Sequence, residues 1–171
     1  MKIKIFLRGL ILGMIVTSLF VTNLKAQYST GFGLRIGGTS GLDIKHFYKP
    51  SKAFEGIIGT FGNGISFTGL IEKYQPIHNA QGLYVYYGGG AHLAFYNGRS
   101  EYYSYFGREI NYYKNNDVGL GINGIVGLEY RLPEDIPIAF SLDLKPFVEL
   151  GIGGYVSFAP DPSLGIKFII R

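Results

Sequence analysis

Residues 82–97, GLYVYYGGGAHLAFYN, decide the fold of this chain. Side chains two positions apart lie on the same side of a β-strand, and here the two sides differ in character. The apolar side carries Leu83, Val85, Tyr87, Ala91, Leu93 and Phe95. The other side carries Tyr84, Tyr86, Gly88, Gly90, His92, Ala94 and Tyr96. We therefore predict one long strand with an apolar face and a face of small, hydroxylated or imidazole side chains.

The same alternation returns along the chain, and residues 118–131 repeat it most clearly. Short stretches rich in Gly, Pro, Asn and Ser separate most of the alternating segments, as turns do. The eight predicted strands are residues 28–37, 42–48, 54–61, 65–73, 82–97, 118–131, 138–148 and 164–171. Strand 54–61 alternates least well, because Ile57 and Phe61 share the parity of Glu55. No segment after residue 26 has a helical period long enough to assign, so the predicted class is all-β.

The N-terminus has the three-part layout of a secretory signal peptide. Lys2, Lys4 and Arg8 precede an uncharged apolar run at residues 9–21, and a short polar stretch ends at Ala26. A membrane-spanning helix needs roughly 20 apolar residues, so this run is too short for one. We expect a signal peptide at residues 1–26, cleaved after Ala26, and one domain at residues 27–171.

Removal of this leader changes the charge balance. The whole chain has 16 Lys+Arg and 12 Asp+Glu, and residues 1–26 hold four basic residues and no acid. The mature chain is therefore formally neutral, which gives no support to nucleic-acid binding. The chain has no cysteine, so an exported domain must be held by hydrogen-bond ladders and packing rather than by disulfides. It also has no cysteine for a lipoprotein anchor.

Eight short-turned antiparallel strands can close into a small barrel without free edges. A soluble lipocalin-like barrel would turn its apolar side inward, and a membrane barrel would turn it outward. The non-apolar side of strand 82–97 has no charge at neutral pH, which is unusual for a solvated surface and fits a crowded lumen. Aromatic residues also gather at one end of the apolar side, as an interfacial girdle does; they are Tyr28, Tyr48, Phe54 and Tyr130. Both observations favour the membrane barrel.

The connections support the same interpretation. If strand 28–37 starts in the periplasm, the long connection 98–117 lies outside the cell and the tight turn 133–137 lies in the periplasm. Short periplasmic turns and longer outer loops are usual for outer-membrane barrels.

On its leader, strand number, girdle and loop asymmetry, the chain at residues 27–171 resembles the small eight-stranded OmpA/OmpX-like β-barrels of Gram-negative outer membranes. The resemblance implies an antiparallel up-and-down transmembrane barrel in the outer membrane, a monomer in contact with outer-membrane lipid and lipopolysaccharide. Such barrels usually end on an aromatic residue that assists assembly, whereas this chain ends Phe168-Ile169-Ile170-Arg171. Phe168 still falls on the outward face.

By parity, twelve charged side chains point into the lumen, six of each sign. They are Arg35, Asp43, Lys45, Glu55, Glu72, Glu129, Arg131, Asp143, Lys145, Glu149, Lys167 and Arg171. An eight-stranded barrel is just wide enough for side chains to fill it, and lone charges there would be too costly. We predict a paired, hydrogen-bonded plug, with a narrow porin-like path for ions or small solutes as the alternative.

The long connection is a candidate contact surface for an extracellular protein, a glycan or lipopolysaccharide. Its candidate residues are Arg99, Tyr102, Tyr103, Tyr105, Phe106, Arg108, Tyr112 and Tyr113. Tyr and Arg are enriched at binding hot spots, and exposed loops often carry function. The alternative is a protruding hairpin whose aromatic side chains pack on one another.

Some small outer-membrane barrels modify lipid A, and deacylases of that kind use a His-Ser pair with an acid on the lipid-facing side. The three histidines here, His46, His78 and His92, have no His-Ser or His-x-Ser spacing. Glycines 88–90 lie in a strand with no helix to receive a phosphate, and more plausibly make room where the wall bends. We expect no catalytic residue, no cofactor and no metal. The predicted function is a non-enzymatic envelope protein, with the porin-like channel as alternative and a lipid A-modifying enzyme as a more distant one.

Overall fold

A computed structural model describes residues 29–97, 102–105, 108–111, 117–133, 136–154 and 156–170; for 102–105 and 108–111 it describes the backbone only. The predicted signal peptide, Tyr28 and Arg171 lie outside the described residues. Within that part of the chain, no helix is long and apolar enough to cross a membrane.

The described residues form β-strands and their connections. The strands are β1 (Thr30–Gly37), β2 (Ser40–Lys49), β3 (Lys52–Phe61), β4 (Gly64–Pro76), β5 (Leu83–Tyr96), β6 (Tyr102–Tyr105), β7 (Arg108–Asn111), β8 (Asp117–Arg131), β9 (Ile138–Leu144), β10 (Phe147–Gly151), β11 (Val156–Ala159) and β12 (Pro162–Ile170).

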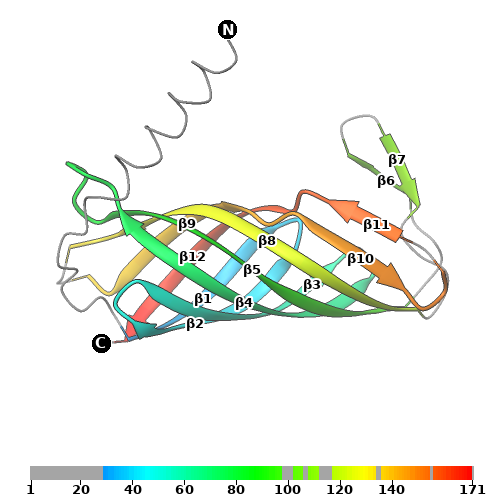
Figure 1. Cartoon of the computed structure of the whole chain (residues 1–171), viewed down its shortest axis with the longest axis horizontal. Helices are drawn as coiled ribbons and strands as arrows, with labels where there is room; N and C mark the ends of the chain where they lie inside the picture. The colour runs from blue at the N-terminus through cyan, green and yellow to red at the C-terminus, as the bar shows by residue number, and fades with distance from the viewer. Residues whose placement is uncertain are drawn as a thin grey trace, which may run out of the picture.

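All of these strands except β6 and β7 belong to an eight-stranded antiparallel barrel, which confirms the predicted all-β barrel architecture (Figure 1). The hydrogen-bonded order runs β8, β5, β4, β3, β2, β1, β12, β9, and β9 pairs back onto β8. The longest ladder joins β5 to β8, from Leu83↔Tyr130 to Tyr96↔Asp117. Strand β1 pairs with β12 from Thr30↔Ile170 to Gly37↔Ser163, so the first and last strands of the barrel are neighbours.

The seventh and eighth walls of the barrel are each interrupted. The predicted strand 138–148 breaks at Lys145 and Pro146, because proline has no N–H for the ladder. The Pro146 carbonyl instead accepts from the Gly124 N–H at 2.9 Å, and the Lys145 N–H donates to the Asp161 carbonyl at 3.0 Å. The last wall begins earlier than predicted, with β11, and bends at Asp161 before β12.

The connection 98–117, expected as a loop, contains a small hairpin of its own. Strands β6 and β7 pair from Tyr102↔Asn111 to Tyr105↔Arg108 as a separate two-stranded sheet. Figure 1 shows this hairpin at the end of the barrel opposite the C-terminus.

The two faces of the wall are those predicted from the alternation. Outward-pointing apolar side chains are exposed on every wall; examples are Ile36 on β1, Ile122 on β8 and Leu164 on β12, each at least 62% exposed. On β5, Leu93 and Phe95 are exposed while His92 and Tyr96 are buried. The interior therefore holds the polar and charged set, and the exterior holds the apolar set.

The weak alternation of β3 has a structural reason. Ile57 and Phe61 point inward with Glu55, and each is buried. Ile57 packs in an interior cluster with Leu70, Tyr74, Tyr86 and others. The lumen thus contains apolar patches between its charges. The inward face of β3 carries both kinds of side chain, so its sequence does not alternate clearly between apolar and polar residues.

Glycines in the middle of β5 allow the neighbouring strand β4 to approach closely. A Cβ on Gly90 would collide with the carbonyl oxygen of Gly69 on β4, and one on Gly88 would collide with that of Ile71. This agrees with the expectation that glycines 88–90 make room in the wall.

Candidate functional site

The structure places eleven of the twelve charged side chains assigned to the lumen inside the barrel. All eleven are buried: Arg35, Asp43, Lys45, Glu55, Glu72, Glu129, Arg131, Asp143, Lys145, Glu149 and Lys167. The twelfth, Arg171, lies outside the described residues. The buried charges form four groups connected by ion pairs and hydrogen bonds.

Lys45 on β2 is the centre of the largest group. Its Nζ lies 2.8 Å from Glu72 Oε2, 3.3 Å from Glu55 Oε1 and 3.9 Å from Glu129 Oε2. It also donates to the Tyr74 hydroxyl at 2.5 Å. Because these partners come from β3, β4 and β8, one ammonium group ties together four walls of the barrel.

Tyrosines and Arg131 extend this group toward the end that holds the C-terminus. The Tyr74 hydroxyl donates to Glu129 Oε2 at 3.0 Å, and the Tyr74 ring stacks on Tyr86 with centroids 4.9 Å apart. Arg131 Nε donates to Glu129 Oε1 at 2.8 Å, and its guanidinium lies 4.1 Å from the Tyr84 ring centroid. Aromatic rings and charged groups therefore pack against one another at this level of the lumen.

Lys167 on β12 belongs to the Lys45 group through Glu55, and Arg35 with Asp143 on β9 forms a second group. Lys167 Nζ lies 2.5 Å from Asp43 Oδ2 and 3.3 Å from Glu55 Oε1. Arg35 reaches across to Asp143 with two bonds of 2.6 and 3.1 Å. Such bidentate charge-assisted pairs are the strongest and most directional kind.

The Asp143 carboxylate has two more donors, which satisfy it on both oxygens. The Tyr86 hydroxyl donates to Oδ2 at 2.8 Å, and the Ser163 hydroxyl donates to Oδ1 at 2.9 Å. Tyr86 therefore joins the Asp143 group to the ring stack beside Lys45.

The end of the lumen nearer the β6–β7 hairpin holds His92 and Glu149. His92 Nε2 lies 2.8 Å from Glu149 Oε2, and Nδ1 lies 2.7 Å from Asn123 Oδ1. The Tyr96 hydroxyl donates to the same carboxylate at 2.8 Å. Two β8 glycines make space for this group: a Cβ on Gly121 would collide with the His92 ring, and one on Gly119 would collide with the Glu149 carboxyl.

Asp161 is a buried acid that the alternation did not assign. It lies between β11 and β12 at φ 41°, with no exposed surface. Its Oδ1 accepts from the Thr39 N–H at 2.6 Å, its Oδ2 accepts from the Thr39 hydroxyl at 2.7 Å, and Lys145 Nζ is 2.6 Å from Oδ2. The sequence feature that marks Asp161 is its position between Pro160 and Pro162. Strand parity does not apply there, so it could not assign the side chain to either face of the wall.

Asp117 is the second acid that the parity count left out, because it stands just before the predicted strand 118–131. It is buried, and its carboxylate accepts from the N–H groups of Val118 and Gly153. With Asp117 and Asp161, the described interior has eight carboxyl groups and five Lys or Arg side chains. The six-to-six balance read from parity does not hold for this part of the chain.

A small cavity lies beside one of these groups. Its volume near His92 is about 10 Å³, room for roughly one water molecule. It is lined by Thr39, Phe61, Ser66, Thr68, His92, Tyr96, Lys145 and Phe147.

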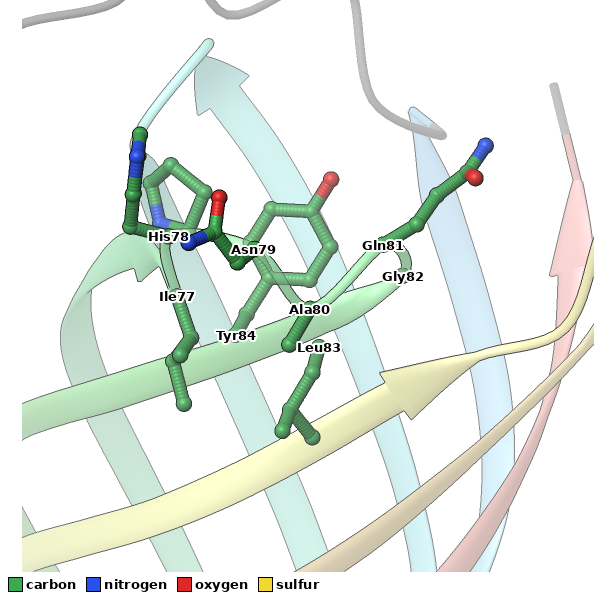
Figure 2. A pocket seen from close by; sticks show the side chains of 9 residues that line it. Ile77, His78, Asn79, Ala80, Gln81, Gly82, Leu83 and Tyr84 are labelled. Atoms are coloured by element: carbon green, nitrogen blue, oxygen red, sulfur yellow. The ribbon is translucent and has the colours of Figure 1, made fainter.

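A larger hollow lies outside the lumen, at the connection between β4 and β5. Figure 2 shows Tyr84 inside the turn, while His78 and Gln81 point away from the strands. The turn is made possible by left-handed backbone at Asn79 and Gly82. None of its lining side chains is buried.

Of the three histidines, His92 is hydrogen-bonded to the Glu149 carboxylate at 2.8 Å. His92 is buried in the lumen, and His78 is exposed in the turn. His46 is exposed on the outer wall, where Nδ1 lies 3.0 Å from the Thr30 hydroxyl with no hydrogen bond to a described carboxylate. In the same part of the chain, no group of three His, Cys, Asp or Glu side chains could hold a metal ion.

The candidate contact residues of the 98–117 connection are described only in part. The backbones of Tyr102, Tyr103 and Tyr105 lie in β6, and that of Arg108 lies in β7. The remaining candidates, Arg99, Phe106, Tyr112 and Tyr113, lie outside the described residues. Both interpretations of this connection therefore stay predictions.

No protein-family model and no curated protein sequence matches this chain.

Proposed function

We propose that this protein is a non-enzymatic barrel of the Gram-negative outer membrane, with a closed lumen and an exposed hairpin that makes surface contacts. The observation that carries the proposal is the distribution of side chains across the wall. Charged groups are buried inside, and large apolar side chains are exposed on all eight walls. This is the reverse of a soluble barrel and the pattern of a barrel in lipid.

The extent of the apolar exterior supports a lipid environment. Soluble monomers rarely expose a contiguous apolar patch of more than a few hundred Å², whereas here the exposed apolar side chains encircle the molecule. A strand crosses a bilayer with about 9–11 residues. Strands β2, β3, β4, β5 and β8 have 10 to 15 residues, enough to cross with tilt.

The filled interior supports a closed lumen. Lys45 and its partners span β2, β3, β4 and β8, and Arg35 spans to Asp143 on β9. Separation of these pairs to let an ion pass would expose uncompensated buried charges. A porin-like channel is therefore the alternative that a conductance measurement distinguishes.

The test uses protein purified from the envelope of an expressing Gram-negative cell. A mobility difference between boiled and unboiled samples on a gel first establishes a folded barrel. In a planar bilayer, we expect no steady unitary conductance. Discrete conductance steps whose ion selectivity changes in Glu72→Gln or Lys145→Gln would refute the closed lumen and favour the channel.

The contact role of the hairpin has a separate test. A variant lacking residues 99–116 should still form the barrel, because the β5–β8 ladder from Leu83↔Tyr130 to Tyr96↔Asp117 lies outside the deletion. We expect cells carrying it to lose binding to lipopolysaccharide micelles or to an extracellular ligand. A folded deletion variant that retains all surface binding would contradict the contact role.

A further inference from the structure

The exposed charges among the described side chains are all basic, and they lie next to one another. Among the side chains that the structure describes, every Asp, Glu and Arg is buried, and so are Lys45, Lys145 and Lys167. The exposed charged side chains of that part of the chain are Lys49, Lys52 and Lys73.

These three lysines form a row across neighbouring strands. Lys49 on β2 pairs with Lys52 on β3, and Lys52 pairs with Lys73 on β4. Like charges directly opposite each other destabilise a sheet. The ion pairs of the described residues all involve other cations. No described carboxylate therefore lies within 4 Å of the amino groups of these three lysines. The row therefore attracts anions from outside the described structure.

Its surroundings indicate where those anions would be. Two residues further along the wall, on the same face, Phe54 pairs with Ile71, and both are exposed apolar side chains. Exposed tyrosines flank the row: Tyr48 precedes Lys49, and Tyr87 pairs with Lys73. Tyrosine and lysine beside the edge of an apolar belt are typical of the headgroup level of a membrane.

The row lies at the end of the barrel opposite the β6–β7 hairpin. Thr30 pairs with both His46, near the end of β2, and Ile170, near the end of β12. The β2–β3 turn is therefore at the end that holds the C-terminus, which Figure 1 shows away from the hairpin. In the proposed orientation this end faces the periplasm, where the leaflet consists of phospholipid rather than lipopolysaccharide.

We propose that Lys49, Lys52 and Lys73 form a binding site for the phosphate groups of anionic phospholipids in the periplasmic leaflet. This inference rests on the proposed membrane function. The three ammonium groups donate hydrogen bonds to lipid phosphate oxygens. Tyr48 and Tyr87 lie among the lipid headgroups, and the acyl chains lie along Phe54 and Ile71. Each lysine beside an anionic surface strengthens binding by roughly fivefold, so the row favours an anionic over a zwitterionic lipid.

The test is native mass spectrometry of the envelope-purified protein, in detergent with equal amounts of phosphatidylglycerol and phosphatidylcholine. We expect bound phosphatidylglycerol to exceed bound phosphatidylcholine about fivefold or more at low salt, and the ratio to fall as salt rises. The ratio should drop to near one in K49Q/K52Q/K73Q and be retained in K49R/K52R/K73R, which keeps the charges.

Two results would overturn the inference: equal binding of both lipids to the wild-type protein, or a phosphatidylglycerol preference that survives the triple Gln substitution. If the triple Gln variant fails to fold, the single variant K73Q replaces it, with a reduced ratio expected. A preference for lipid A over phosphatidylglycerol that the lysine substitutions abolish would also overturn it. Failure of the proposed function is seen separately, as failure of the wild-type protein to insert into phosphatidylcholine vesicles in a flotation assay.

Discussion

Replacement of Lys45 by methionine should strongly destabilise the barrel. Lys45 has no exposed surface, and its ammonium group is within 4 Å of Glu55, Glu72 and Glu129. Methionine has a similar length and no charge, so Lys45→Met keeps most of the packing. It leaves three buried carboxyl groups without their shared cation.

Removal of one partner from a buried ion pair typically costs about 3–5 kcal/mol, since it leaves an uncompensated charge in a low-dielectric interior. Lys167 and Arg131 remain beside Glu55 and Glu129, whereas Glu72 has no second ion-pair partner among the described residues. We therefore expect a loss of about 3–5 kcal/mol for Lys45→Met. The double variant K45M/E72Q should recover at least about 1 kcal/mol of it, because the amide carries no charge.

The assay is equilibrium denaturant unfolding in phosphatidylcholine vesicles, which carry no net charge. Lys49→Met is the matched control, the same substitution on the same strand at an exposed position, and should change stability by no more than about 0.5 kcal/mol. A loss below about 1 kcal/mol for Lys45→Met would refute the reasoning, since it would mean that water already screens the lumen charges. A K45M/E72Q variant less stable than K45M would refute the assignment of the penalty to Glu72.

Three other substitutions test different features of the fold. Gly90→Ala should prevent folding, since its Cβ would collide with the Gly69 carbonyl, whereas Gly69→Ala meets only the Phe54 ring at 3.7 Å and should fold normally, as judged by heat-modifiable gel mobility. Asp161→Ala should lower the free energy of unfolding by about 3–5 kcal/mol because Lys145 loses its buried partner. Asparagine tolerates left-handed backbone, so Asp161→Asn should lower the free energy of unfolding less. An equal loss in both variants would contradict the claim that the left-handed backbone at residue 161 matters. Tyr74→Phe removes the hydroxyl between Lys45 and Glu129 and should cost about 1–3 kcal/mol in the same unfolding assay; an unchanged midpoint would show that water replaces the hydroxyl.

The sequence alone determined the strands and their two faces. Side chains alternate with a period of two whatever the neighbouring strand is, so residues 82–97 and 118–131 reveal both faces locally. The inward assignment of Lys45, Glu72 and Asp143 follows from that parity. Parity also placed Lys145 correctly in the lumen, although the strand breaks at Lys145 and Pro146. It gave no assignment for Asp161, which lies outside the predicted strands.

Only the tertiary structure decided which residues meet. The pairing of Lys45 with Glu72, or of Arg35 with Asp143, depends on register and on strands far apart in the chain. The row of Lys49, Lys52 and Lys73 shows the same limit, because Lys73 joins the two lysines of the β2–β3 turn only through the β3–β4 register. The local sequence determines how side chains alternate along each strand. Closure of the barrel determines which strands, and so which side chains, contact each other.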